Sequence, residues 1–134
     1  MDIPRGNSKA DIKAREKIIS DVYRQWYNAH PDRRAYNYNL KAYINVRYLS
    51  VTETVEKAAR TYLSTLAVLQ LDTILAQSKK YGPAQTPKHN SNQKGFVKMI
   101  VMRYNMIGVG IVKMTVGLKQ SGEYVQYCIT HIQV

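Results

Sequence analysis

The spacing of hydrophobic positions predicts helices in the first half of the chain and strands near its end. Between Ser8 and His30 an apolar residue recurs every three or four positions, which is typical of an amphipathic helix over residues 9–30. Ser8 followed by Asp11 resembles a capping box at its start, and Pro31 prevents His30 from continuing the helix. The apolar stripe consists of Ile12, Ile19, Val22, Tyr23 and Trp26.

A short strand and two further helices are predicted next. A polar, tyrosine-bearing loop precedes residues 43–49, whose β-branched and aromatic content favours a strand. Ser50 and Glu53 form a capping box that predicts the start of a second helix. The apolar pattern changes phase near residues 69–71, so we expect a break there and a third helix up to about Tyr81.

A flexible connector rich in turn-forming residues, over 83–95, leads to a segment with the alternating pattern of strands. Three strands are predicted, over residues 96–104, 109–118 and 123–132. With a four-residue loop at 105–108 and a two-residue loop at 121–122, the expected pairs are Met99–Met114, Met114–Ile129, Thr115–Cys128, Val116–Tyr127, Lys113–Thr130 and Lys98–Thr115.

This register predicts a sheet with one apolar and one polar face. The core face would carry Val97, Met99, Val101, Val112, Met114, Val116, Val125, Tyr127 and Ile129. The opposite face would carry Lys98, Ile100, Lys113, Thr115, Gln126, Cys128 and Thr130. We therefore expect an α+β fold, in which N-terminal helices pack on one face of a small antiparallel sheet. That sheet would combine the three-stranded C-terminal meander with the short strand near 43–49.

A chain of 134 residues is long enough for one domain with its own core. Residues 43–134 would form the compact α+β core, with the helix over 9–30 as a further element that could mediate assembly. Cys128 is the only cysteine, so no internal disulfide or cysteine-based zinc site is expected. No apolar run reaches the length of a membrane span, and the polar N-terminus does not resemble a signal peptide. The expected location is the cytoplasm, or a virion.

Charge changes the picture most. The formal net charge is +11, and no aspartate or glutamate occurs between Thr73 and Gly122. Such a field favours a polyanionic partner, with nucleic acid ahead of an anionic membrane because no helix has a basic face opposite an apolar one. Eleven tyrosines against one phenylalanine favour the same partner, because tyrosine stacks on bases. The alternative is that the charge serves only solubility.

Lys98 and Lys113, with Thr115 and Thr130 beside them, would form a phosphate site on the polar face. Lysines held close together could act in proton transfer or stabilise the charged transition state of phosphodiester cleavage. The alternative is an ordinary solvated face with lysines that protect the sheet edge. His89, in the connector, is the strongest acid–base candidate of the three histidines.

Catalytic roles are thus expected for His89, Lys98, Lys113 and Thr130. Contacts with nucleic acid are expected from Lys88, Lys94, Arg103, Thr115 and Gln126. His30 is expected to be structural, and His131 to point toward the core. The nine carboxylates lie mostly in the helices, so neither an acidic metal cluster nor any cofactor is expected.

The order of elements resembles a known group. A short strand, the run "LSVTETVEKAARTYLSTLAVLQLDTIL", a basic connector with "KH" and a meander ending in "YCIT" resemble modules of phage and mobile-element polyvalent proteins. More distantly, the layout is similar to the superfamily of barnase, the EndoU nucleases, the tRNase colicins and RelE-type toxins. The resemblance covers residues 43–132 and implies metal-independent RNA cleavage on the exposed sheet face. It points to Lys88, His89, Lys98, Lys113 and Thr130.

Three functions are therefore open. The first is a phage or mobile-element protein that binds RNA more readily than DNA and cleaves it without metal. The second is a non-catalytic structural or accessory protein that binds nucleic acid, with the first helix mediating contact with a second copy or a partner protein. The third is an adaptor whose basic face meets an acidic protein.

Overall fold

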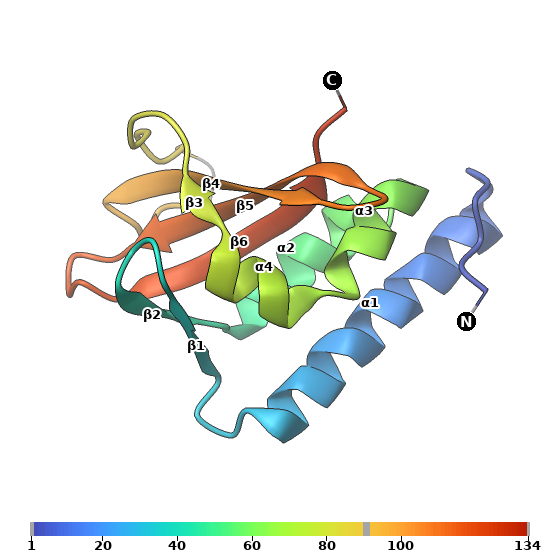
Figure 1. Ribbon diagram of the computed structural model, residues 1–134, viewed down its shortest axis with the longest axis horizontal. Coiled ribbons are helices and arrows are strands. Elements are labelled where there is room, and N and C mark those ends of the chain that lie inside the picture. The colour runs from blue at the N-terminus through green and yellow to red at the C-terminus, as the bar shows by residue number, and fades with distance from the viewer. Residues whose placement is uncertain (1, 90–91, 134) are drawn as a thin grey trace.

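A six-stranded sheet with helices gathered on one side of it forms the structure, a computed structural model that describes residues 2–89 and 92–133 (Figure 1). The strand order is β1-β2-β6-β5-β4-β3. The strands are β1 (Arg34–Asn37), β2 (Ala42–Asn45), β3 (Lys79–Lys80), β4 (Lys98–Met106), β5 (Gly110–Leu118) and β6 (Tyr124–His131). The helices are α1 (Lys9–Ala29), α2 (Tyr48–Ala58), α3 (Tyr62–Val68) and α4 (Leu71–Gln77).

The predicted α+β class is confirmed, and so are the first helix and the C-terminal meander. Ser8 caps α1, because its Oγ accepts a hydrogen bond from the Asp11 N–H at 3.1 Å. Strands β4, β5 and β6 lie close to the predicted bounds. None of the helices in the described part of the chain is long and apolar enough to cross a membrane.

The sheet is mixed rather than purely antiparallel, because β2 pairs with β6 in parallel. The strand predicted over 43–49 is shorter, since β2 ends at Asn45 and the chain turns into α2. Strand β1 lies in the segment that we expected to be a loop, and it pairs with β2 as an antiparallel hairpin. Alternation of side chains in so short a hairpin is a weak signal, so the sequence pattern missed it.

The helices differ from prediction at their ends. Helix α2 begins at Tyr48, and the Arg47 N–H donates to Ser50 Oγ at 2.9 Å, so Ser50 lies in the first turn rather than before it. The break near 69–71 is confirmed, but a second break separates α2 from α3, where Thr61 caps the new helix. Helix α4 ends at Gln77, and the residues expected to finish it form β3.

The pairing of β5 with β6 is confirmed over most of its length. Lys113 faces Thr130, Met114 faces Ile129, and Thr115 faces Cys128, as the pattern predicted. A bulge follows Thr115, so Val116 faces Gln126 and not Tyr127.

The predicted pairing of β4 with β5 is wrong by three residues. Met102, not Met99, faces Met114, while Met99 faces Gly117. The connecting loop is shorter than expected, since Met106 already pairs with Gly110, which has a φ of 104°. The Phe96 ring also lies over Gly117, where an added Cβ would be 2.5 Å from Cδ1. An odd shift moves every β4 side chain to the other face.

The core face of the sheet therefore differs from the prediction. Ile100, Met102 and Tyr104 join Val112, Met114, Val116 and Ile129 in the main core. Met99, Val125 and Tyr127 are buried in a smaller cluster with Phe96. Val101 lines a groove described below, and Val97 is 48% exposed. The face opposite the main core is called the outer face here.

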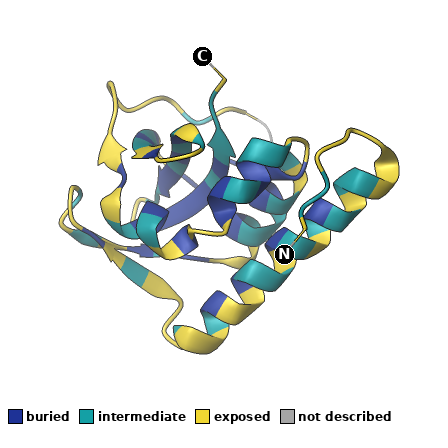
Figure 2. Cartoon of the chain, turned by 45° about the vertical axis from the view of Figure 1, so that its right-hand side comes forward, coloured by how far each residue is buried: buried dark blue, intermediate teal, exposed yellow. Residues whose placement is uncertain are grey.

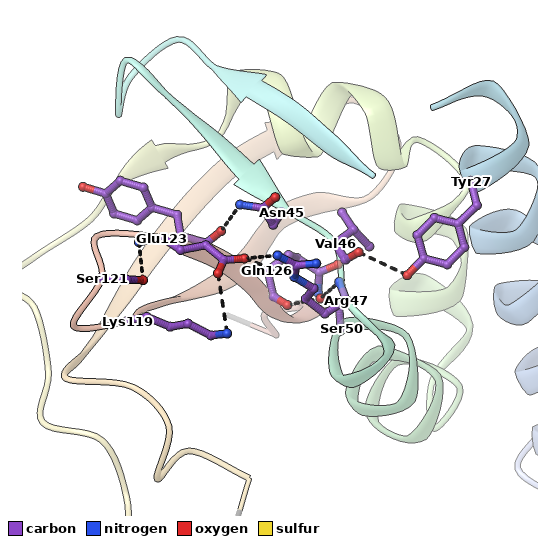
Figure 3. A network of polar contacts seen from close by, with 10 residues as sticks. Tyr27, Asn45, Val46, Arg47, Ser50, Lys119, Ser121, Glu123 and Gln126 are labelled. Atoms are coloured by element: carbon purple, nitrogen blue, oxygen red, sulfur yellow. Dashed lines mark hydrogen bonds and ion pairs between the residues drawn. The ribbon is translucent and has the colours of Figure 1, made fainter. Parts of the chain in front are cut away.

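Side-chain hydroxyls of α2 and α3 form hydrogen bonds with the backbone of β6 where no strand pairs with it. Ser50 Oγ donates to the Gln126 carbonyl, Thr54 Oγ1 accepts from the Ile129 N–H at 3.3 Å, and Ser64 Oγ accepts from the His131 N–H at 2.8 Å. Figure 3 shows the first of these contacts, between Ser50 and Gln126, and the nearby hydrogen bond that Arg47 donates to Glu123. Helix α2 thus occupies the place of another strand and positions its remaining side chains beside the outer face.

Helix α1 uses its apolar stripe within the chain. Ile19, Tyr23 and Trp26 are buried in the main core, and the Tyr23 hydroxyl donates to Gln126 Oε1 at 2.7 Å. The opposite side of α1 is polar and exposed (Figure 2). Assembly through α1, which remains a prediction, would therefore involve that polar side.

Candidate nucleic-acid interface

A groove of about 720 Å³ lies over the outer face of β4, β5 and β6. Residues 81–88, which run beside β4, form one wall, and Glu53 and Lys57 of α2 line the other side. The floor consists of Val101, Arg103, Lys113, Thr115, Cys128 and Thr130. We refer to this feature as the groove.

A row of cations crosses the sheet and enters the groove at Arg103 and Lys113, which line it. Lys79 of β3 faces Arg103 of β4, Arg103 faces Lys113 of β5, and Lys113 faces Thr130 of β6. Directly opposed residues on neighbouring strands point to the same face, at a strand spacing of about 4.8 Å. Within residues 2–89 and 92–133, no ion pair involves any of these three cations. Like charges in this arrangement repel each other, so the row favours binding of an anion.

Arg103 is held in place by Tyr81. The guanidinium carbon lies 3.6 Å from the centre of the Tyr81 ring, which fixes the plane of the side chain. Its Nε is buried and has no hydrogen-bond partner in the described part of the chain. A planar guanidinium with donors to spare suits a phosphate, which accepts two parallel hydrogen bonds.

A buried carboxylate lies on the α2 side of the groove. Glu53 is 4% exposed and accepts a hydrogen bond from Asn92 Nδ2 at 2.9 Å. Burial, with the neighbouring Glu53 carboxylate, raises the pKa of Tyr127 to about 12. The same two causes raise the pKa of Cys128 to about 11, so this thiol is protonated at neutral pH.

Five of the predicted site residues line the groove: Lys88, Arg103, Lys113, Thr115 and Thr130. The expectation that Lys98 and Lys113 project from the same face of the sheet is wrong. Lys98 faces Leu118 and lies, by alternation along β4, on the face opposite to Lys113. Arg103, not Lys98, is the cation of β4 that lies beside Lys113.

The remaining predicted residues lie outside the groove lining. His89 and Lys94 are exposed in the connector. Gln126 is fully buried, and its amide donates to Thr54 Oγ1 at 3.0 Å, so the expectation that it contacts a ligand is corrected. The bulge in β6 is the reason, because it turns Gln126 toward the helices.

The structure adds residues that sequence reasoning assigned to other roles. The sequence pattern predicts Glu53 as half of a capping box and Tyr127 as a core residue. Both line the groove, together with Lys57 and Tyr81. Glu53 lies in the second turn of α2, among the buried residues of this helix. The apolar pattern gave no signal for Glu53, because the buried face of α2 also carries Ser50 and Thr54.

The other two histidines lie away from the groove. His30 stacks on Trp26 with ring centres 4.4 Å apart, and its Nε2 lies 3.5 Å from Asp72 Oδ1, as expected of a structural residue. His131 faces Val112, so it points to the core face as predicted. In the described ranges, no three His, Cys, Asp or Glu side chains gather in a metal-binding arrangement.

Comparison with known proteins adds no relative: no family model, no curated protein and no solved structure matches the chain.

Proposed function

We propose that this protein binds RNA along the groove, with the row of Lys79, Arg103 and Lys113 contacting phosphates. The observation that carries the proposal is that these cations face one another across three strands without an acid between them. Thr115 and Thr130 offer hydroxyls beside them, as in phosphate contacts of nucleic-acid-binding proteins. A flexible polyanion fits a long open groove better than a single small anion does.

Salt dependence of binding tests this proposal. Affinity of the purified protein for a fluorescein-labelled RNA should fall linearly on a log–log plot against salt, because bound phosphates release counterions. The double variant Arg103→Ala/Lys113→Ala should reduce the slope by about 1.4, at about 0.7 for each lost phosphate contact on a single strand. A DNA of the same sequence shows whether the 2′-hydroxyl contributes.

Lys98→Ala is the matched control, because Lys98 leaves the same sheet on the opposite face. It should change neither the affinity nor the slope. Equal losses in Lys98→Ala and in the double variant would show that RNA responds only to net charge, and the groove would be the wrong site. An RNA affinity that does not respond to salt would contradict the proposal as a whole.

RNA cleavage without metal is the second candidate, favoured by the position of Glu53 in the same groove as Arg103 and Lys113. In such a reaction a carboxylate takes the proton of a 2′-hydroxyl, whose oxygen attacks the adjacent phosphorus. The 5′-oxygen then leaves with a proton from water, and a cyclic phosphate remains. The two cations would stabilise the charge that develops on the phosphate.

Incubation of RNA with the protein in EDTA tests cleavage, with cyclic phosphate ends as the product. Glu53→Gln should abolish cleavage and leave binding intact. Glu56→Gln is the control, because Glu56 lies on the same helix but is exposed and pairs with Arg60. His89→Ala and Lys98→Ala test the two residues that the sequence suggested and that the groove lining does not include. Binding without cleavage would favour the accessory role, in the cytoplasm or in a virion.

A further inference from the structure

We infer that the β1–β2 hairpin is a stacking platform for unpaired bases, which would make the RNA bound by this protein single-stranded. This inference rests on the proposed function and adds the class of RNA to it. The platform consists of Tyr36, Tyr38 and Tyr43, which we call the tyrosine cluster. It has no role in the groove, and it is the largest group of exposed aromatic rings in the described part of the chain.

The three rings contact one another. Tyr36 faces Tyr43 directly across the hairpin, with ring centres 5.3 Å apart and an angle of 79° between the rings. Tyr38, in the turn, lies 5.5 Å from Tyr36 in a similar edge-on arrangement. The Arg34 guanidinium carbon lies 4.0 Å from the centre of the Tyr43 ring. Edge-on packing leaves ring faces open, except the face of Tyr43 that Arg34 covers, and Arg34 adds a cation within the group.

The rings pack mainly on each other and are open to solvent. Tyr36 is 39% exposed, Tyr43 45% and Tyr38 64%, whereas Tyr23 in the core is 1% exposed. The core side of the hairpin is provided by Ala35 and Ile44, which face each other on the opposite side. The tyrosine cluster is therefore not needed to fill the core, and its exposed aromatic area calls for another explanation.

Two hydrogen bonds hold the tip of the β1–β2 hairpin beside the chain that enters β3. The Tyr38 N–H donates to the Ala76 carbonyl at 3.1 Å, and the Lys80 N–H donates to Asn39 Oδ1 at 2.9 Å. Lys80 follows Lys79, which begins the row, and precedes Tyr81 in the groove wall. Figure 1 shows the tip of the β1–β2 hairpin beside the chain that enters β3. A strand whose phosphates follow the row can thus reach the rings at the hairpin.

Exposed aromatic rings distinguish single strands from duplexes. In a duplex the base faces are stacked on each other, and only edges and phosphates are accessible. In a single strand each base has a face that can stack on a tyrosine, and any sequence is accepted. Cations next to aromatic rings are the combination that such single-strand sites use. The chemistry of the tyrosine cluster therefore selects an unpaired strand.

Fluorescence anisotropy with two labelled RNAs tests the inference: a twelve-residue oligouridine and a twelve-base-pair duplex. Wild-type protein should bind the single strand more tightly. Tyr38→Ala should weaken single-strand binding about tenfold, as expected for one lost stacking contact, and leave duplex binding unchanged. The salt slope should not change, because no phosphate contact is removed. Tyr38→Phe, which keeps the ring, should bind like wild type.

Tyr48→Ala is the matched control, because Tyr48 is 82% exposed but lies on α2, outside the tyrosine cluster. Thermal unfolding of each variant checks that the hairpin is intact. Should wild-type protein bind neither RNA, the proposed function itself fails. Should Tyr38→Ala and the triple variant Tyr36→Ala/Tyr38→Ala/Tyr43→Ala bind the single strand like wild type while the Arg103→Ala/Lys113→Ala variant loses it, only the stacking inference is overturned. A change of oligomeric state in the triple variant without loss of RNA binding would assign the cluster to protein contact and also overturn it.

Discussion

Arg103 and Lys113 face each other on adjacent strands, with Lys79 on the next strand and no acid in the row. Placing like charges directly opposite costs stability, and the fold keeps them on the outer face where side chains can spread. The repulsion between these cations destabilises the empty protein, and a bound anion would relieve it. A surface that binds phosphates has this property. The relationship therefore yields predictions for the empty protein as well as for the complex.

Lys113→Gln should stabilise the protein in the absence of RNA. Removing one of two opposed cations relieves a repulsion of roughly 0.2–1 kcal/mol. Urea unfolding at low salt measures the change in the free energy of unfolding. The gain should shrink at high salt, where screening already weakens the repulsion. Lys119→Gln is the control, because Lys119 pairs with Glu123 at 3.5 Å and its loss should not stabilise. A less stable Lys113→Gln variant would mean that the row is not under repulsion.

Cys128 should report occupancy of the groove. Since its pKa is raised from 9.0 to about 11, its thiolate fraction at pH 8 is about a hundredfold below that of an unperturbed thiol. Iodoacetamide should therefore modify it slowly at pH 8, and faster as the pH rises toward 11. Saturating RNA should slow the reaction further, because Cys128 lies in the groove floor.

The Arg103→Ala/Lys113→Ala variant supplies the control for this protection, since RNA should no longer shield the thiol in it. Glu53→Gln should speed modification in the protein without RNA, because the Glu53 carboxylate is one of the causes that raise the pKa of Cys128. RNA that binds wild-type protein tightly without slowing the reaction would place the nucleic acid away from the groove.

The sequence pattern was sufficient for the class of the fold but not for the pairing of β4. Both faces of this strand carry apolar residues, with Met99 and Val101 on one and Ile100 and Met102 on the other. Alternation alone therefore could not choose between the two faces. The choice depends on the short loop before Gly110 and on the Phe96 ring over Gly117, which are contacts across the sheet. The expectation that Lys98 and Lys113 share a face was wrong for this reason.

Other parts of the site depend on where elements begin. Helix α2 starts at Tyr48, so Glu53 lies within the helix, whereas the capping box predicted at Ser50 placed it at the helix end. The cationic character of the site was predictable, because no acid occurs from Thr73 to Gly122 and every charge on β4 and β5 is therefore positive. Which cations lie opposite each other was not predictable, because this depends on the pairing of β4 with β5.

Arg15 should be among the residues most important for stability. It is fully buried, and its Nε donates to the Ala59 carbonyl at 2.8 Å, just after the end of α2. Its Nη1 donates to the carbonyls of Pro4 and Gly6 at 2.8 and 2.7 Å. Arg15→Met fills the space but leaves these carbonyls without donors, which should cost about 3 kcal/mol.

Urea unfolding measures this change, with fluorescence of the single, buried Trp26 as the signal. Arg24→Met is the control, because Arg24 is exposed on the same helix and pairs only with Asp21. Its loss should cost less than about 1 kcal/mol, as is usual for surface ion pairs. Equal effects of the two substitutions would show that Arg15 contributes no more than a surface arginine.

The contact of Arg47 with Glu123 should give the protein a defined loss of stability in acid. Glu123 accepts from Arg47 Nε at 3.1 Å, and Lys119 lies nearby (Figure 3). Partial burial favours the neutral form of Glu123, but the hydrogen bond and charge of Arg47, together with Lys119, lower its pKa below the ordinary 4.5. A carboxyl whose pKa is lower in the folded state stabilises above the ordinary pKa. That stabilisation is lost as the pH falls through the folded value.

A double-mutant cycle with Arg47→Gln and Glu123→Gln isolates the interaction. At pH 7 the coupling should be about 0.5–1 kcal/mol, because both side chains are partly exposed. At pH values well below 4.5 it should fall toward zero, since Glu123 is then protonated in both states. This contact joins the end of β2 to the start of β6. It therefore stabilises the parallel pairing of these two strands, after which the chain enters α2. A coupling that is equal at both pH values would mean that the charge of the Glu123 carboxylate contributes nothing to this contact. Packing alone would then position α2 beside the groove.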